Sequence, residues 1–164
     1  MAVNNVEIAW DATPTNFTVT NLESLADGNV WQSGVVDDAT PSKEWVRISF
    51  ALVFNTTPVA GDSVIFRLAQ GDEAASDEIW SGGIGTSESE ISTAASIAAI
   101  QATMAPVYQV AWQTNMAVGG FEGTFDLYSP GPSWQLLIEA NGEALTTGNV
   151  VRYRYGTSQI QAAV

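Results

Sequence analysis

A strict alternation of apolar and polar side chains between residues 45 and 54 is the strongest constraint on the fold of this chain. Every second residue from Val46 to Phe54 is a large apolar one, and the residues between them include Arg47 and Ser49. Successive side chains of a β-strand point to opposite faces, so a period of two residues predicts a strand with one buried face. We expect this strand to line the core of a β-sheet protein.

A second alternating run, over residues 64–69, follows turn signals at Pro58 and Gly61. Its even-numbered residues are apolar and are expected to face inward. The short separation between the two runs predicts an antiparallel hairpin. In that hairpin, Arg47 and Arg67 would lie near each other on the outer face.

Further strands are predicted along the chain, with turns between them. Residues 133–140 form a third clear strand, which the turn dipeptide at 141–142 ends because Asn and Gly both tolerate positive φ. A last strand alternates over residues 150–155, and weaker strands are expected at 6–10, 17–20, 30–36, 107–113 and 121–128. About eight to ten short strands predict an all-β fold, an antiparallel and jelly-roll-like β-sandwich. The mass of 17.4 kDa suits a single domain over residues 1–164.

The segment from Ser81 to Ala105 departs from this pattern, because Gly, Ser, Thr and Ala dominate it. Its composition predicts a long loop, within which residues 94–103 could form a short helix with Ile97, Ile100 and Met104 on one side. Loops longer than about 12–15 residues are usually functional or disordered. This segment is therefore either a plain surface loop or an interaction arm. The candidate contact residues of such an arm are Trp80, Ile84, Ile97 and Ile100.

The chain contains neither histidine nor cysteine, which excludes most catalytic machinery. A Ser-His-Asp triad, a thiolate nucleophile and a cysteine-ligated zinc or iron–sulfur site all need one of these residues. A Ser-Lys dyad would depend on Lys43, the only lysine, whose neighbours indicate an exposed turn. The acidic residues form many pairs, but no spacing singles out an acid and a nucleophile. We expect no enzymatic activity and no cofactor.

The charge balance excludes two further classes of partner. Lys and Arg number 5 against 18 Asp and Glu, which gives a formal net charge of -13. Nucleic acids and anionic membrane surfaces attract clustered Lys and Arg, so neither is expected as a partner. No stretch approaches the roughly 18 apolar residues of a membrane span, and the first residues lack the pattern of a secretory signal. We expect synthesis in a cytoplasm.

The densest group of acidic residues lies between Gly71 and Glu78. Without histidine, a metal site here would consist of oxygen ligands and would favour calcium or magnesium. The spacing does not match an EF-hand loop, and a solvated acidic turn explains the same residues. We expect no bound metal; Asp72, Asp77 and Glu78 are the candidate ligands, and Asp37-Asp38 is a second candidate that a turn between strands explains as well.

The six tryptophans offer a different kind of binding site. Exposed aromatic rings can stack on sugar rings, as they do in carbohydrate-binding β-sandwiches. Most of the tryptophans are expected in the core, since large aromatic side chains are usually buried. Trp80, which lies beside Gly82 and Gly83, is the one most expected at the surface.

Three stretches of the chain carry a resemblance to a known class of proteins. The first is the run NLESLADGNVWQS at residues 21–33, which Asp37-Asp38 follows. The second is the pair of alternating runs between residues 46 and 68, and the third is PSWQLLIEA at 132–140 leading into GNVVRY at 148–153. Together they resemble small β-sandwich structural proteins from the virions of tailed bacteriophages.

This resemblance implies a non-enzymatic virion component. Such proteins serve as capsid decoration (cement) proteins, often trimers that bridge major capsid subunits, or as head or tail fibre modules. We therefore expect a homotrimeric decoration protein on the capsid surface, with the major capsid protein as its partner and contacts through residues 1–5, 158–164 and 81–105. The absence of cysteine suits assembly in a reducing host cytoplasm. The alternative is a tail or fibre-associated receptor-binding module that recognises host carbohydrate.

Overall fold

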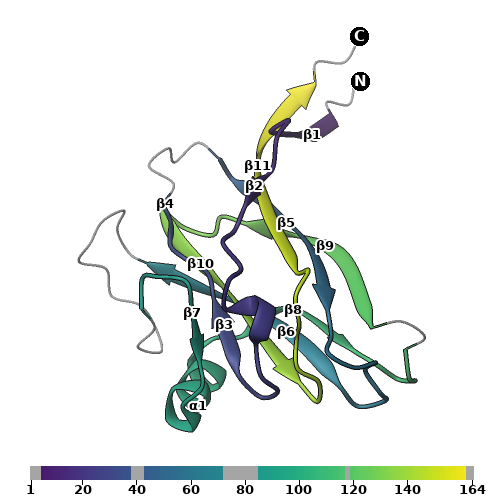
Figure 1. Cartoon of the computed structure of the whole chain (residues 1–164). Coiled ribbons are helices and arrows are strands. Elements are labelled where there is room, and N and C mark those ends of the chain that lie inside the picture. The colour runs from purple at the N-terminus through teal and green to yellow at the C-terminus, as the bar shows by residue number, and fades with distance from the viewer. Residues whose placement is uncertain (1–4, 38–42, 72–84, 117–118, 162–164) are drawn as a thin grey trace.

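Two antiparallel β-sheets pack face to face in the computed structural model, which describes residues 5–37, 43–71, 85–116 and 119–161 (Figure 1). The prediction of an all-β sandwich is confirmed. A short 3-10 helix, η1 (Leu22–Ser24), and one α-helix, α1 (Ala94–Thr103), complete the described elements. Within those ranges, no helix has the length and apolar character needed to span a membrane.

The first sheet, sheet A, has the strand order β1-β11-β5-β9. A short strand, β2, pairs with β11 on the same side as β1. Because β11 is the longest strand of the chain, it can bind β1 and β2 in succession along one edge and β5 along the other. The bounds are β1 (Asn5–Trp10), β2 (Thr15–Asn16), β5 (Trp45–Val53), β9 (Gly120–Tyr128) and β11 (Val150–Gln161).

The second sheet, sheet B, has the strand order β7-β3-β10-β6-β8, and β4 pairs with the beginning of β10. Its central strand is β10, in which every residue from Ser133 to Ala140 is buried. Both faces of a strand are buried only when each is covered, so sheet B has a layer on either side. The bounds are β3 (Val30–Gln32), β4 (Val36–Asp37), β6 (Ser63–Gly71), β7 (Ser89–Ile91), β8 (Pro106–Ala111) and β10 (Ser133–Asn141).

The predicted hairpin between the two alternating runs is wrong, although both runs are strands. β5 pairs with β9 and β11, whereas β6 pairs with β10 and β8, so the two strands belong to different sheets. Their apolar faces meet across the core instead, where the ring centroids of Phe50 and Phe66 lie 4.6 Å apart. Consequently Arg47 and Arg67 are not neighbours, because one lies on the outer face of each sheet.

One hydrophobic core fills the space between the sheets. It is rich in aromatic side chains, and Trp31, Trp134 and Phe66 are fully buried in it. Phe17 packs edge-on against both tryptophans, with centroid distances of 6.2 and 5.9 Å. Trp31 and Trp134 thus meet the expectation of core tryptophans, because such contacts bury their large surfaces. Trp112 is only partly buried against this core, and Trp10 and Trp45 are half-buried outside it.

Helix α1 covers the outer face of sheet B and forms a second, smaller core (Figure 1). Ile100 and Met104 are buried there against Val30, Ala69 and Leu137. The helix predicted over residues 94–103 is confirmed, and its apolar side faces the sheet. The described part of the expected long loop is therefore a strand, β7, followed by a helix, and both belong to the sheet B side of the sandwich.

Candidate functional site

A two-stranded ribbon, formed by the first and the last described strands, extends from the sandwich (Figure 1). β11 pairs with β5 only from Val150 to Gly156, yet it continues to Gln161. Over residues 156–161 its partner is β1, in a register that runs from Trp10 opposite Gly156 to Asn5 opposite Gln161. We call β1 together with residues 156–161 the terminal ribbon. It is the only part of sheet A, among the described strands, that has no second sheet behind it.

A glycine at the base of the terminal ribbon allows its two strands to pack closely. A Cβ atom at Gly156 would lie 2.7 Å from Ile8 Cγ2 and 2.8 Å from Trp10 Cε3, closer than real contacts allow. Both side chains therefore lie over the backbone of β11 at this point. Since Ile8 and Trp10 are on the same face of β1, this face of the ribbon is apolar at its base.

Trp10 is fixed from the sandwich side by two arginines. The guanidinium carbon of Arg47 lies 4.2 Å from the centre of the Trp10 ring, and that of Arg154 lies 5.7 Å away. Arg47 itself donates to both carboxylate oxygens of Asp126, with N–O distances of 2.7 and 2.8 Å. The hydrogen bond with Asp126 raises the pKa of Arg47 above its ordinary value. This chain of contacts joins β1 to β9 across the width of sheet A.

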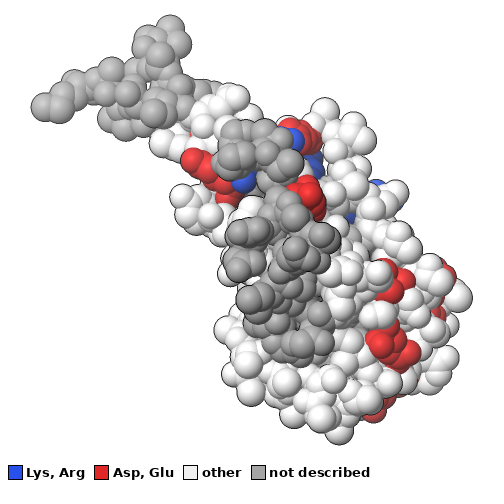
Figure 2. Space-filling model, turned by 90° about the vertical axis from the view of Figure 1, so that its left-hand side faces the viewer, with Lys and Arg blue, Asp and Glu red and all other residues white. Residues whose placement is uncertain are grey.

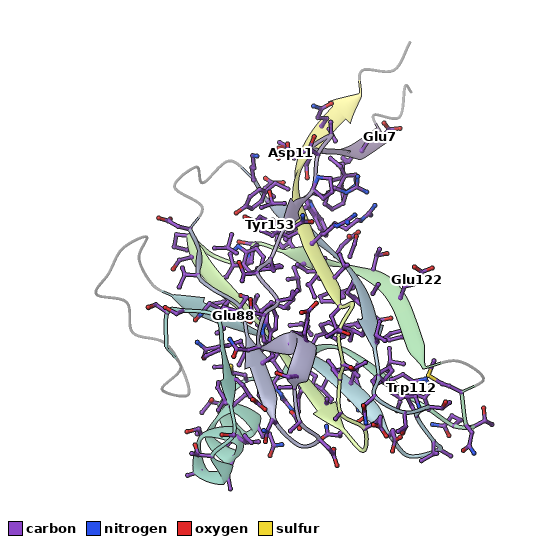
Figure 3. The ribbon with its side chains drawn as sticks, viewed as in Figure 1. Glu7, Asp11, Glu88, Trp112, Glu122 and Tyr153 are labelled. Atoms are coloured by element: carbon purple, nitrogen blue, oxygen red, sulfur yellow. The ribbon has the colours of Figure 1, made fainter. Side chains whose placement is uncertain are left out.

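Further contacts fasten the base of the ribbon. Asp11 donates its backbone N–H to the carbonyl of Tyr155 at 2.8 Å. Its carboxylate forms an ion pair with the ammonium of Lys43, with an N–O distance of 2.6 Å. Lys43 also lies 4.7 Å from the centre of the Tyr155 ring. Trp45 donates its indole N–H to the hydroxyl of Ser158 at 3.1 Å. Figure 3 shows Asp11 at this base and Glu7 farther out along the ribbon.

The two long edges of the terminal ribbon are open. The backbone N–H of Asp11 donates to the carbonyl of Tyr155, which shows that the odd-numbered residues of β11 form the hydrogen bonds with β1. The even-numbered residues Ser158 and Ile160 therefore direct their N–H and C=O groups to the opposite edge. By the same alternation, Val6 and Ile8 direct theirs to the outer edge of β1. No strand in the described ranges pairs with either edge.

The terminal ribbon carries little charge in a strongly acidic chain. Residues 155–164 contain no charged side chain, and Glu7 is the only one among residues 1–10. On the face that Figure 2 shows, the Lys and Arg atoms lie in the upper half, close to the base of the ribbon. Val6, on the apolar face of the ribbon, is 66% exposed. An open, nearly uncharged strand pair with an exposed valine has the character of a contact surface.

A second surface feature is a shallow cleft of about 230 Å³ beside the turn between β9 and β10. Tyr128 forms one wall and is 65% exposed, with its ring centre 4.9 Å from that of Trp45. Ser129 has a positive φ of 48° and donates its N–H to the carbonyl of Glu44 at 2.7 Å. The remaining lining residues are Lys43, Glu44, Pro130, Gly131 and Pro132. An exposed aromatic ring beside charged groups can bind a ring-shaped polar ligand.

The residues singled out from the sequence have different outcomes. Asp72, Asp77, Glu78, Trp80 and Ile84 lie outside the described residues, so their roles as metal ligands or contacts stay predictions. In the segments that the structure does describe, no group of three or more acidic side chains is arranged to hold a metal ion.

Ile97 and Ile100 lie on the side of α1 that faces sheet B. Ile100 is fully buried and Ile97 packs against the same small core, so packing within the chain explains their apolar character. An interaction role for them stays a prediction. Contact residues were also expected at 158–164. The described part of that range, residues 158–161, forms the end of β11 in the terminal ribbon, and its contact role stays a prediction.

Two comparisons with known proteins assign no function to the terminal ribbon. No protein-family model matches the chain. No curated protein matches its sequence either.

Proposed function

We propose that this chain is a non-enzymatic structural protein of a tailed-bacteriophage virion, and specifically a capsid decoration protein that bridges neighbouring major capsid subunits. The observation that carries the proposal is the terminal ribbon, which presents open strand edges away from the body of the sandwich. Unpaired strand edges are templates for pairing with another chain. A protein with such an extension is suited to assembly.

The base of the ribbon makes it an efficient contact element. Gly156, Trp10 and Arg47 hold the ribbon in one orientation relative to sheet A before any partner binds. An element that is ordered in advance loses less conformational entropy on binding, so more of the contact energy appears as affinity. Contacts that form only on the assembled shell then stabilise the shell against opening, by mass action.

The resemblance of residues 21–33, 132–140 and 148–153 to virion β-sandwich proteins supports the capsid as the place of assembly. The net charge of -13 supports it too, because like-charged copies repel one another except through designed contacts. The major capsid protein is the partner under this proposal. The protein would be assembled in the host cytoplasm and reside on the capsid surface.

Gold-labelled antibody electron microscopy on purified particles from the source tests this proposal directly. Label spread over the head supports a decoration protein, and a copy number of hundreds per particle is expected. Label confined to the tail or its tip contradicts decoration and supports the alternative function. A complete absence of label on particles removes the virion assignment altogether.

The Tyr128 cleft favours a second candidate function, a tail or fibre-associated module that recognises carbohydrate. An exposed ring supplies the stacking surface, and Lys43 and Glu44 supply hydrogen-bonding groups at the rim. Trp45 touches Tyr128, so its fluorescence should change when a host glycan binds. Replacement of Tyr128 by alanine should abolish that change, whereas a response that persists in Tyr128→Ala excludes the cleft as the glycan site.

A further inference from the structure

We propose that the terminal ribbons of three copies of this chain join into a closed six-stranded antiparallel barrel. In this arrangement the open edge of β11 in one copy pairs with the open edge of β1 in the next copy. The inference rests on the proposed function, because it assigns the contact that makes the decoration protein a trimer. The occupant of both open edges is therefore a second copy of this chain.

The first argument is that the ribbon is incomplete by itself. A two-stranded hairpin is marginally stable in water unless it has further strands or a packed face. Beyond Gly156 the ribbon has no backbone pairing with β5, whose Trp45 reaches Ser158 only through its side chain, yet the pairing with β1 continues as far as Asn5 and Gln161. Additional strands on both edges would supply the support that the sandwich does not provide.

The second argument is that the two edges are complementary. Ser158 and Ile160 offer backbone donors and acceptors on one side of the ribbon, and Val6 and Ile8 offer them on the other. β1 and β11 run in opposite directions, so a ring of copies related by rotation places each β11 antiparallel to the β1 of its neighbour. A two-fold contact between two β11 strands would leave the outer edges of both β1 strands open.

The third argument is that the ribbon has an apolar face that a closed ring would bury. Val6 and Ile8 share this face of β1, and Val6 lies opposite Ile160 in the register. The side chains on the other face of β1 and β11 include Glu7, Thr157 and Gln159, which are polar and exposed. In a barrel with the apolar face inside, small side chains such as valine and isoleucine fill the narrow interior.

The number of copies follows from the same geometry. Two copies supply four strands, which are too few to close a barrel around side chains, because the barrel diameter grows with strand number. Three copies supply six strands with a narrow interior that suits the few small apolar side chains of each ribbon. The net charge of -13 on each chain favours copy-to-copy contact through weakly charged surfaces, and Glu7 is the one charged residue of the terminal ribbon.

The experiment measures the solution mass of the full chain by sedimentation equilibrium over a range of protein concentrations. We expect a species of about three times the chain mass of 17.4 kDa. Ser158→Pro removes the N–H that faces the open edge without removing a bond to β1, so it should raise the concentration needed for trimer formation more than about tenfold. Ser158→Ala is the matched control, because it also loses the bond from Trp45 but keeps the N–H, and it should stay a trimer.

A second pair of variants tests the apolar face in the same assay. Val6→Asp places a charge inside the proposed barrel and should give monomers. Val59→Asp makes the same change at an exposed residue of the turn before β6, and it should leave the trimer intact. Circular dichroism on all four variants checks that the sandwich is folded.

The outcomes separate this inference from the proposed function. A wild-type monomer, dimer or tetramer overturns the six-stranded barrel, even if the protein decorates capsids. A trimer that persists in both Ser158→Pro and Val6→Asp overturns it as well. A trimer that both variants disrupt, in a protein that binds no capsid, upholds the barrel and contradicts the decoration function alone.

Discussion

The outer faces of the two sheets use the same kind of ion pair in opposite environments. On sheet A, Arg47 meets Asp126 at 2.7 Å on a face that is open to solvent. On sheet B, Arg67 meets Glu139 at 3.2 Å beneath α1, where both side chains are almost completely buried. The comparison shows that α1 covers the ion pair of sheet B, whereas among the described residues the ion pair of sheet A stays partly open to solvent.

The buried pair is part of a larger network that binds the helix to the sheet. Arg67 donates to the carbonyl of Met104, the residue that follows α1, and Glu139 accepts hydrogen bonds from Gln101 and Asn141 at 2.8 and 3.1 Å. A buried charge is stable only when its partners satisfy it, so these bonds are needed once α1 has closed over the sheet. The exposed pair on sheet A carries no such requirement, because water can replace either partner.

The largest predicted effect is the loss of one member of the buried pair. Arg67→Ala leaves the carboxylate of Glu139 buried without its cation, and it should lower the free energy of unfolding by about 3–5 kcal/mol. Urea denaturation measures the change. The double variant Arg67→Met with Glu139→Leu removes both charges and should recover most of the stability. If Arg67→Ala lowers the free energy of unfolding by less than about 1 kcal/mol, solvent reaches the pair of Arg67 and Glu139.

The next largest effect tests the cover of sheet B through its apolar contacts. Ile100→Ala leaves a cavity between α1 and Leu137 and should cost about 2–5 kcal/mol in the same denaturation experiment. Val59→Ala removes apolar atoms from an exposed position and serves as the control, with an expected change within about 0.5 kcal/mol. Equal losses in the two variants would mean that α1 adds little to stability.

A smaller, local effect is expected at the base of the terminal ribbon. Gly156→Ala forces a Cβ atom against Ile8 and Trp10, which should cost about 1–3 kcal/mol and loosen β1 rather than the sandwich. Hydrogen exchange should therefore speed up at β1 amides and stay unchanged in β10. Gly34→Ala is the control, since the nearest atom to its added Cβ lies 4.0 Å away. Unchanged protection of β1 in Gly156→Ala would contradict the close packing.

The smallest effect belongs to the exposed pair on sheet A. A double-mutant cycle with Arg47→Ala and Asp126→Ala should give a coupling of about 0.2–1 kcal/mol. The coupling should fall as salt is added, because ions screen charges at the surface. A coupling as large as that of Arg67 and Glu139, unchanged in high salt, would remove the contrast between the two faces.

The sequence alone predicts which side chains face inward more reliably than it predicts which strands are neighbours. Alternation identified β5 and β6 correctly, because periodicity reports the buried face of a strand. It could not show that they belong to different sheets. A short connection can lead from one sheet to the other at the end of the sandwich, just as it can join two strands of a hairpin. The same limit explains Arg67, which the pattern places on an outer face but which α1 buries.

The candidate site was only partly visible in the sequence. The helix over residues 94–103 and the apolar side that contains Ile100 followed directly from spacing. The last strand was expected over residues 150–155, where the alternation lies, but it continues to Gln161 through Gly156. That glycine makes room for Trp10, a contact between the two ends of the chain that no local pattern encodes.

The continuity of β11 has a mechanical consequence. The same strand forms the open edge of the terminal ribbon and lies between β2 and β5 inside sheet A. A force that pulls the ribbon away from the body acts along β11, whereas the hydrogen bonds to β5 are perpendicular to that direction. Such a load shears the whole register from Val150 to Gly156 at once instead of opening it pair by pair. A tether of this design resists tension, as the proposed decoration function would require.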